Sequence, residues 1–411
     1  MKPLFTTLVC LLLITACGDN KSKKTTFSTD DYLHVIDLNK TAPEIKFSEV
    51  FASITPIVLE TTKNSLIGYI DKIIATPEYI IVHDYSIANA LFLFKKDGTF
   101  LHKFGRMGNG PGEYTNIADF CYDKATGTIY MLCFNDRINL YDIHTGSFLK
   151  SIKLQNNNGS GRKIYYQDGE LYVVLGHFTN EGGYLLNRIN QTTGKVEEAW
   201  FDFETHSKNV DYNFLDPFLF GDDKSFKFCN ALMDGIILFE KGKITPFLTF
   251  PPEYIFTKDD FKALEPNAHI GHYLTKFHKL RGVSIYYERK DFIFLICMMP
   301  MPTKLIYDKG TKDFKYVGEY GQLGDDLMYK KYIRSRSDPT NKNEIKQTFS
   351  SFIASDDNGL YAVHSESQSP KNMRMLLEGD YISDYFKSAA TKLANLEEDV
   401  NPFLFYYEFK D

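Results

Sequence analysis

The chain has 411 residues, of which 43% are hydrophobic and 24% are charged, and its formal net charge is −6. This composition is typical of a folded globular protein and is too apolar for a disordered one. The mild acidity argues against a nucleic-acid partner, because nucleic-acid binders carry a clustered basic excess. The chain has 34 Phe and 27 Tyr residues, an abundance that favours half-buried β-sheet.

The first residues have the pattern of an export signal. Lys2 supplies a positive charge, and residues 4–14 form an apolar stretch that is shorter than the ~20 residues needed to span a bilayer. The stretch ends Ile14-Thr15-Ala16-Cys17, which resembles the lipobox of bacterial lipoproteins. The resemblance implies that residues 1–16 are a signal peptide and that Cys17 is acylated. The alternative is an ordinary signal peptide with a chance cysteine.

The segment that follows is expected to be a tether. Residues 19–29 are polar and have no hydrophobic period, so we expect residues 17–36 to link the lipid flexibly to the folded body. The protein would then be a monomer anchored in the cell envelope, at the outer membrane. Lys21, Lys23 and Lys24 stand where surface-exported lipoproteins of some Gram-negative groups have an acidic run, which favours the periplasmic side.

From residue 54 onward the chain is a series of short apolar or alternating runs separated by tight-turn signals, such as Asp97-Gly98 in the first unit. Four strands in roughly 40–50 residues match one blade of a β-propeller. The sequence therefore predicts an all-β fold, a six-bladed β-propeller of four-stranded antiparallel blades over residues 37–411. The six units lie at residues 70–104, 117–154, 163–203, 218–250, 283–320 and 349–377.

Both ends of the predicted propeller carry a strand signal. If the last blade borrows a strand from the opposite terminus, the runs Thr55–Glu60 and Phe403–Phe409 complete one blade and leave no free sheet edge. We expect Met373–Leu377 to be a further strand of the sixth unit. Capping and helical spacing predict short helical insertions at residues 257–264 and 380–396.

Four cysteines remain after the signal peptide and Cys17, namely Cys121, Cys133, Cys229 and Cys297. They have no Cys-x-x-Cys spacing, so we do not expect a zinc site. Two arrangements stay open. The four side chains are buried as small apolar groups, or Cys121 and Cys133 form a disulfide across one hairpin, which an oxidising periplasm would permit.

Three segments carry a family resemblance. They are Leu59-Glu60-Thr61-Thr62, the glycine-rich run from Phe104 to Tyr114, and the run from Leu396 to Pro402 before the last aromatic strand. Together with the lipobox they resemble the six-bladed β-propeller lipoproteins of the Bacteroidota, which are relatives of NHL-repeat propellers. The resemblance covers residues 37–411. It implies the fold, and it implies no activity.

The glycine run from Gly105 to Gly112 differs from a nucleotide-binding loop, because strand-like sequence flanks it on both sides and no Gly-Lys-Ser/Thr follows. We expect its glycines to adopt positive φ in a connection between two blades. Arg106, Glu113 and Tyr114 would then project at a face of the propeller and could contact a ligand.

Two classes of function fit the sequence. The first is a lipid-anchored, non-catalytic binding or scaffold protein of the cell envelope, whose ligand would be a glycan, a peptide or a protein. The alternative is a propeller hydrolase or lyase, similar in architecture to lactonases, in which carboxylates and Asn side chains bind Ca²⁺ on the axis. The sequence has neither a Gly-x-Ser-x-Gly nor a His-Glu-x-x-His motif, which favours binding without a cofactor.

Two long stretches interrupt the blade pattern, at residues 251–281 and 321–347. Both carry aromatic and basic residues, which are enriched at binding sites. We expect the two insertions to lie on one face of the propeller and to form a ligand groove near its axis. Tyr332, Arg334 and Arg336, in the second insertion, are the expected ligand-binding residues of that groove.

Overall fold

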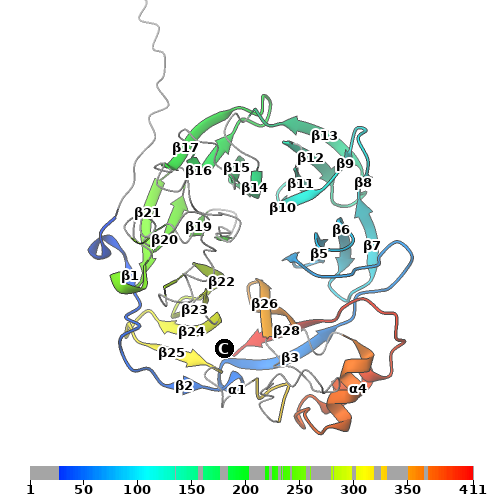
Figure 1. Ribbon diagram of the computed structural model, residues 1–411, viewed down its shortest axis with the longest axis vertical. Coiled ribbons are helices and arrows are strands. Elements are labelled where there is room, and N and C mark those ends of the chain that lie inside the picture. Colours follow the sequence, from blue (N-terminus) through cyan, green and yellow to red (C-terminus); the bar gives the residue numbers. More distant parts are fainter. Residues whose placement is uncertain are drawn as a thin grey trace, which may run out of the picture.

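Figure 1 shows the computed structural model as a ring of six β-sheets, each with at least four strands. The predicted fold class, a six-bladed propeller of four-stranded antiparallel blades, is confirmed. The structure describes residues 27–134, 136–155, 161–175, 184–202, 218–221, 225–229, 233, 235–240, 243–255, 260, 279–280, 282–298, 302–318, 325–330, 350–364 and 369–410.

In blades 1 to 5 the strands run from the innermost to the outermost in chain order. Blade 1 consists of β4 (Lys72–Ala75), β5 (Tyr79–Asp84), β6 (Ala90–Lys95) and β7 (Phe100–Phe104). Blade 2 consists of β10 (Ile117–Asp123), β11 (Thr128–Cys133), β12 (Arg137–Asp142) and β13 (Phe148–Lys153), and blade 3 of β14 (Gly161–Gln167), β15 (Glu170–Leu175), β16 (Tyr184–Ile189) and β17 (Val196–Asp202). Blade 4 consists of β18 (Phe218–Gly221), β19 (Phe226–Cys229), β20 (Gly235–Glu240) and β21 (Lys243–Thr249). Blade 5 consists of β22 (Val283–Glu288), β23 (Phe292–Met298), β24 (Pro302–Asp308) and β25 (Phe314–Val317). Blade 6 consists of β26 (Ser350–Ser355), β27 (Gly359–His364), β28 (Leu404–Phe409) and, as its outermost strand, β3 (Phe51–Ile57) from the start of the chain.

The position of a strand within its blade explains its sequence pattern. Middle strands lie between two neighbouring blades and are covered on both faces, so β11 is buried at every position and β6 at every position but the last. Such strands have continuous apolar runs. The outer strands β7 and β13 are partly exposed, and their sequences are correspondingly mixed. In the described part of the chain, six clusters of buried apolar side chains form the core of the ring.

The two faces of the ring differ in what they carry. The turns from the first to the second strand and from the third to the outer strand lie on one face, which we call the hairpin face. On the opposite face, which we call the connection face, each inner strand begins, and the chain reaches it from the outer strand of the preceding blade. Loops between the second and third strands also lie on the connection face.

The first and last strands of the propeller close the ring together. β28 pairs with β27 on one side and with β3 on the other, both antiparallel, with Leu404 opposite Ile57 and Tyr407 opposite Ile54. The strand from the start of the chain is therefore the outer strand of blade 6. The predicted closure is confirmed, and the edge of β28 is covered.

The chain before β3 adds two short strands at the rim. β1 (His34–Val35) pairs in parallel with β21 of blade 4, and β2 (Glu44–Ile45) pairs in parallel with β25 of blade 5. Tyr32 and Ile36 are buried. The folded segment thus begins before the expected boundary at residue 37, because the apolar side chains of this otherwise polar stretch pack against the rim of the ring.

One expected strand is a helix, and this prediction was wrong. Met373–Leu377 lies within α4 (Pro370–Glu378), whose amino end has Ser369 as a cap that accepts a hydrogen bond from the backbone N–H of Asn372 at 3.2 Å. A short apolar run fits a strand or a helix equally well, and the flanking Ser-Pro and Gly379 favour the helix. α5 (Lys387–Ala394) lies inside the expected helical insertion 380–396.

The helical additions complete blade 6. α4 and α5 bury Met373, Leu376, Ala390 and Leu393 against the blade, in one apolar cluster that also includes the one-turn helix α1 (Phe47–Val50). Figure 1 shows α4 at the rim, outside β3. The other expected helical insertion, residues 257–264, lies outside the described residues except for Asp260.

Cys121, Cys133, Cys229 and Cys297 are buried and have free thiols. Cys121 packs in the apolar cluster between blades 2 and 3, whereas Cys133 packs in the cluster between blades 1 and 2. Their side chains therefore point to opposite faces of the blade 2 sheet, so a disulfide across the hairpin is not formed. The first of the two arrangements, burial as small apolar groups, is the one observed.

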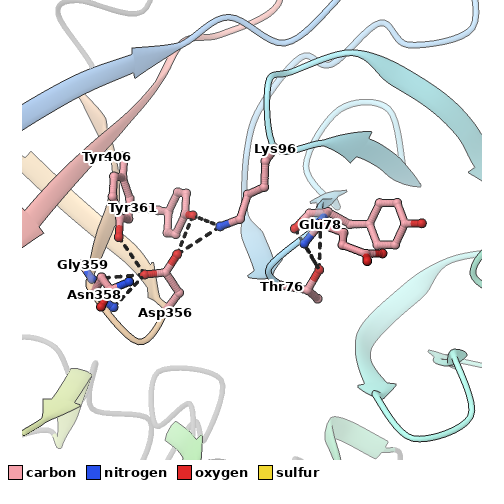
Figure 2. Close-up of polar contacts among 9 residues, drawn as sticks. Thr76, Glu78, Lys96, Asp356, Asn358, Gly359, Tyr361 and Tyr406 are labelled. Carbon is pink, nitrogen blue, oxygen red and sulfur yellow. Dashed lines mark hydrogen bonds and ion pairs between the residues drawn. The ribbon is translucent and has the colours of Figure 1, made fainter.

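An ionic contact on the hairpin face joins the last blade to the first. The Asp356 carboxylate accepts hydrogen bonds from Lys96 Nζ at 3.0 Å and from the hydroxyls of Tyr361 and Tyr406, both at 2.8 Å (Figure 2). The backbone N–H groups of Asn358 and Gly359 complete its contacts. Burial opposes ionisation of Asp356, but these donors outweigh it and hold the pKa of the carboxyl below its usual value.

Replacing this carboxylate should weaken the closed ring. We expect Asp356→Asn to lower the free energy of unfolding by about 2–3 kcal/mol at neutral pH, because hydrogen bonds to a charged, half-buried group are lost. The folded-state pKa of Asp356 is lowered, so its contribution is present at neutral pH and is lost as pH falls through that pKa. In urea unfolding, the difference between Asp356→Asn and wild type should therefore be smaller at pH 3 than at pH 7.

The matched control is Lys330→Met, which removes an ion pair to Asp380 and Asp384 whose carboxylates are exposed. An exposed ion pair contributes little, so we expect a loss below about 1 kcal/mol. An equal loss for both variants, or a difference between Asp356→Asn and wild type that grows as pH falls, would contradict a closing role for Asp356.

Candidate functional site

The buried carboxylate of Asp84 fixes the connection face of blade 1. Asp84, at the end of β5, accepts four backbone N–H groups, those of Gly68 and Tyr69 at 2.7 and 3.1 Å and those of Ile87 and Ala88 at 2.8 and 2.9 Å. It thereby joins the connection before β4 to the loop after β5.

The same two loops have further supports. The Asp71 carboxylate accepts the backbone N–H groups of Tyr85 and Ser86 at 2.7 and 3.0 Å. The buried Asn401, just before β28, accepts from the backbone N–H of Ile67 at 2.9 Å and donates to the backbone carbonyl of Ser65 at 2.7 Å. The loops are therefore held from blade 1 and from the last blade at once.

These rigid loops expose large apolar side chains. Leu66, Tyr69, Tyr85 and Ile87 are 59%, 46%, 48% and 69% exposed, respectively. A Cβ atom at Gly68 would lie 2.5 Å from Cγ2 of Ile87, so the two loops touch at a position that only glycine fits without a shift. We call these four exposed side chains the platform. Apolar side chains that a rigid backbone keeps exposed are typical of binding surfaces.

Next to the platform, a partly buried ion pair joins three inner strands. Asp119 of β10 accepts Lys72 Nζ of β4 at 2.6 Å and the backbone N–H of Ile164 of β14 at 3.0 Å. Burial opposes ionisation of Asp119, but the positive charges of Lys72 and Lys163 outweigh it and hold the pKa of the carboxyl below its usual value. The ionised Asp119 carboxylate therefore links blades 1, 2 and 3.

His83 lies beside the Lys72–Asp119 ion pair. It pairs in register with Lys72, and its ring centroid is 5.9 Å from that of Phe120 and 6.3 Å from that of Tyr85. The side chain is 3% exposed, and its Nε2 atom has no hydrogen-bond partner among the residues that the structure describes. Burial lowers the pKa of His83 to about 4, so the imidazole is neutral at pH 7.

Side chains from three successive blades extend this surface around the axis. Tyr85 follows β5, and Phe134 holds the equivalent position after β11; their ring centroids are 6.2 Å apart. The guanidinium carbon of Arg162, at the start of β14, is 6.0 Å from the centre of the Phe134 ring. Lys72, His83, Tyr85, Phe134, Arg162 and Lys163 together form what we call the mouth site, at the connection-face end of blades 1 to 3.

The glycine-rich run lies farther out, over the outer strands of blade 2. Gly105 and Gly112 have φ values of 62° and 70°, as expected for a connection between blades. The hydroxyl of Tyr141, on β12, donates to the carbonyl of Gly112 at 2.8 Å. The short strands β8 (Arg106–Met107) and β9 (Glu113–Tyr114) pair in parallel and close the loop.

The three expected ligand residues of this run have different surroundings. Arg106 is exposed, and its Nε donates to Glu113 at 2.7 Å. Glu113 also accepts from the backbone N–H of Gly110 at 2.8 Å. Tyr114 is 1% exposed and belongs to the apolar cluster between blades 1 and 2. Its ring is a core group in this structure and is not at a face of the propeller.

The remaining expected site residues, Cys17, Tyr332, Arg334 and Arg336, lie outside the described residues. The inner strands that follow the two insertions in the chain begin at Val283 of β22 and at Ser350 of β26. All inner strands begin at the connection face, so Val283 and Ser350 lie at the same face as the mouth site.

Two further features bear on the classes of function. Within the described ranges, no three His, Cys, Asp or Glu side chains are grouped so that they could hold a metal ion. Among the described helices, none is long and apolar enough to cross a membrane. The carboxylates of the mouth region are engaged by Lys72 and by backbone N–H groups.

Sequence reasoning missed most of the mouth site. Lys72, Asp119 and Lys163 are each near the start of an inner strand, and that shared position was the available signal. Their contact could not be read from spacing, because Lys72 and Asp119 are 47 residues apart in the chain.

The role of Asp84 as a support of the platform can be tested with Asp84→Asn. The amide NH₂ group would face two backbone N–H donors that now have a carboxylate acceptor, so we expect a loss of about 2–3 kcal/mol in the free energy of unfolding. Hydrogen exchange at Gly68, Tyr69, Ile87 and Ala88 should accelerate more than exchange in the strands.

Asp97→Asn is the matched control, since Asp97 is exposed and its carboxylate accepts the backbone N–H of Thr99 in a turn on the hairpin face. We expect its effect to stay within about 0.5 kcal/mol. Unchanged exchange at the four amides in Asp84→Asn would show that Asp84 does not support the platform.

Comparison with known proteins places this fold. The model of the domain of unknown function DUF4934 matches residues 33–408. The crystal structure of a Bacteroides fragilis protein whose name classes it as exported is similar with a TM-score of 0.69 at 17% identity, over 90% of this chain and 99% of that one. A member of the DUF4221 family from Bacteroides vulgatus has a TM-score of 0.50 at 10% identity, over 88% and 97% of the two chains. No curated protein matches the sequence. The two structures share the fold alone, whereas the DUF4934 model extends over the sequence from β1 to β28, and the chain therefore belongs to the DUF4934 family.

Proposed function

We propose that the protein is a lipid-anchored, non-catalytic binding protein of the cell envelope that holds a ligand on its connection face. The anchor rests on the sequence that ends at Cys17. The name of the Bacteroides fragilis relative, which classes that protein as exported, supports the same destination. The lipoprotein character and the relation to NHL-repeat propellers are part of this proposal, as is the position at the outer membrane facing the periplasm.

The observation that carries the binding role is the rigid exposure of the platform beside the mouth site. Asp71, Asp84 and Asn401 fix the backbone of the loops before a ligand arrives. A surface that is ordered in advance loses little conformational freedom on binding, so more of the contact energy appears as affinity. Aromatic and Arg side chains such as Tyr85 and Arg162 are the types that contribute most at interfaces.

The use of the carboxylates supports binding over catalysis. Asp119 is paired with Lys72 and the backbone of β14, and Asp84 has all its contacts with backbone N–H groups. A general base needs a carboxylate or imidazole within reach of a substrate proton, and these two carboxylates are already engaged in holding loops and strands.

We propose that the insertions 251–281 and 321–347 extend the same ligand surface towards blades 5 and 6, with Tyr332, Arg334 and Arg336 as its contacts there. Arg106 and Glu113 would border it at the rim of blade 2. The protein would act as a monomer without a cofactor, with no nucleic-acid partner, and with a glycan, peptide or protein as its ligand.

The anchor is tested by Cys17→Ser. Without the thiol no lipid can be attached there, so the protein should leave the membrane fraction or accumulate as an uncleaved precursor. Fractionation and acyl labelling measure this result. Cys10→Ser, which changes a cysteine within the apolar stretch, is the control and should stay membrane-bound. Normal acyl labelling and membrane partitioning of the Cys17→Ser variant would contradict the proposed lipid anchor.

Binding through the second insertion is tested by Tyr332→Ala combined with Arg334→Ala. We expect capture of the ligand from an envelope extract to fall about tenfold, which corresponds to ~1.4 kcal/mol, while the melting temperature stays unchanged. Tyr385→Ala removes an exposed aromatic ring next to α5 and is the control. Equal capture by wild type and the double variant would exclude the insertion from the ligand surface.

A further inference from the structure

We propose that Asp325, Tyr407 and His364 form a proton-dependent latch, which holds the segment Asp325–Lys330 on blade 6 more tightly at acidic pH than at neutral pH. We call this segment the clasp. The latch is a property of the fold, and no ligand is needed to test it. Its failure would therefore leave the proposed binding function standing.

The clasp is attached to the segment between α4 and α5. The backbone N–H of Lys330 donates to the carbonyl of Tyr381 at 2.8 Å, and the backbone N–H of Ser383 donates to the carbonyl of Met328 at 2.9 Å. Three side chains of the clasp are buried in the apolar cluster of blade 6, those of Leu327, Met328 and Tyr329. The clasp is thus a packed element of the blade, and opening it would break these contacts together.

The carboxyl group of Asp325 is buried at the start of the clasp. Its Oδ1 atom accepts the backbone N–H groups of Leu327 and Met328, both at 3.2 Å, and its Oδ2 atom accepts the hydroxyl of Tyr407 on β28. Burial opposes ionisation and outweighs these donors, so the pKa of Asp325 is raised to about 6, and the neighbouring charge of Asp326 acts in the same direction.

Tyr407 connects this carboxyl group to His364. The hydroxyl oxygen of Tyr407 is 2.8 Å from Nε2 of His364, the last residue of β27. A tyrosine hydroxyl has one hydrogen, so it donates to one neighbour at a time. While Asp325 is ionised, the Tyr407 hydroxyl donates to Oδ2, and Nε2–H of His364 donates to the Tyr407 oxygen.

Proton uptake reverses this chain of hydrogen bonds. A proton that Asp325 takes up from water is held on Oδ2, because Oδ1 already faces two N–H donors. It is then donated to the oxygen of Tyr407, whose own hydrogen turns to Nε2 of His364. The imidazole changes to its other neutral tautomer, with the hydrogen on Nδ1. The cluster thereby loses its buried negative charge and keeps both hydrogen bonds.

The other described groups around the chain leave Asp325 as the one that responds near neutral pH. Burial lowers the pKa of His364 to about 3, and the positive charge of Lys304 on β24 acts in the same direction. The imidazole is therefore neutral above pH 5. The carboxylate of Asp326 accepts the backbone N–H of Ser48, in α1, at 3.0 Å.

These properties determine the direction of the pH effect. In an opened clasp the carboxyl group of Asp325 would be in water, where its pKa is about 3.9; in the closed clasp it is about 6. A raised pKa stabilises the closed form below the lower value, and this contribution is lost as pH rises through the higher value. The equilibrium constant for opening should therefore be about tenfold larger at pH 7.5 than at pH 5.

Hydrogen exchange of the full-length protein measures this opening at the backbone N–H groups of Leu327, Met328 and Lys330. After correction for the intrinsic effect of pH on exchange, opening should increase about tenfold from pH 5 to pH 7.5 in wild type. Asp325→Asn imitates the protonated carboxyl group, because its NH₂ group can donate to Tyr407 while its oxygen accepts the two N–H groups. Opening of this variant should not depend on pH in that range.

Tyr407→Phe distinguishes the latch from a merely structural role. It removes one donor to the carboxylate, so the midpoint of the pH dependence should move to higher pH, whereas a structural role would change exchange equally at every pH. The matched control is Asp308→Asn, which alters a turn carboxylate that accepts the backbone N–H groups of Gly310 and Thr311 at 2.8 Å. Its profile at the clasp should equal that of wild type.

A second measurement needs no variant. In an infrared titration of wild type, part of the carboxylic-acid C=O band should disappear with a midpoint near pH 6. Absence of that component would overturn the latch, even if Asp325→Asn does not fold. Opening that is independent of pH in wild type, equally pH-dependent opening in Asp325→Asn, or an unmoved midpoint in Tyr407→Phe would overturn it as well.

Discussion

The pairing of β28 with β3 is the constraint on which the other features of the structure depend. It places residues from both ends of the chain in one blade and brings the last blade next to the first. Polar contacts cross that junction on both faces, among them Lys96 with Asp356 on the hairpin face and Asn401 with the connection that precedes β4. The loop that carries Leu66 and Tyr69 is held by Asp84 of blade 1 and, once the ring is closed, also by Asn401 of the last blade. The surface proposed for binding therefore depends in part on the closure of the fold.

Buried and half-buried carboxylates in this propeller connect separate parts of the chain. Asp84 joins two loops, Asp119 joins three inner strands, and Asp356 joins two blades. Each is surrounded by donors, which compensates for the cost of removing a charge from water. The large side chains of the platform above Asp84 are exposed and apolar. This arrangement, with carboxylates that order the loops and apolar side chains exposed on them, is what supports a binding function for the connection face.

The similarity to two Bacteroides structures at 17% and 10% identity shows that the blade arrangement tolerates extensive change in sequence. A propeller requires apolar strands of the right length and turns between them, and many sequences meet that requirement. A ligand site requires particular side chains at particular places. The shared fold therefore carries no information about the ligand, and the argument for one must come from the residues of this chain.

The amino-acid sequence by itself determined the number of blades, most of the strands within them and the closure by the two ends, because strand patterns and turn signals are local. It also indicated positive φ at Gly105 and Gly112, and it left burial or a disulfide open for the cysteines. Only the tertiary structure decided that Met373–Leu377 is helical, that the chain before residue 37 packs on the rim, and that Tyr114 is a core residue. The mouth site was decided in the same way. Lys72, Asp119 and Ile164 meet because three blades stand side by side, and a contact between residues so far apart in the chain leaves no local pattern to read.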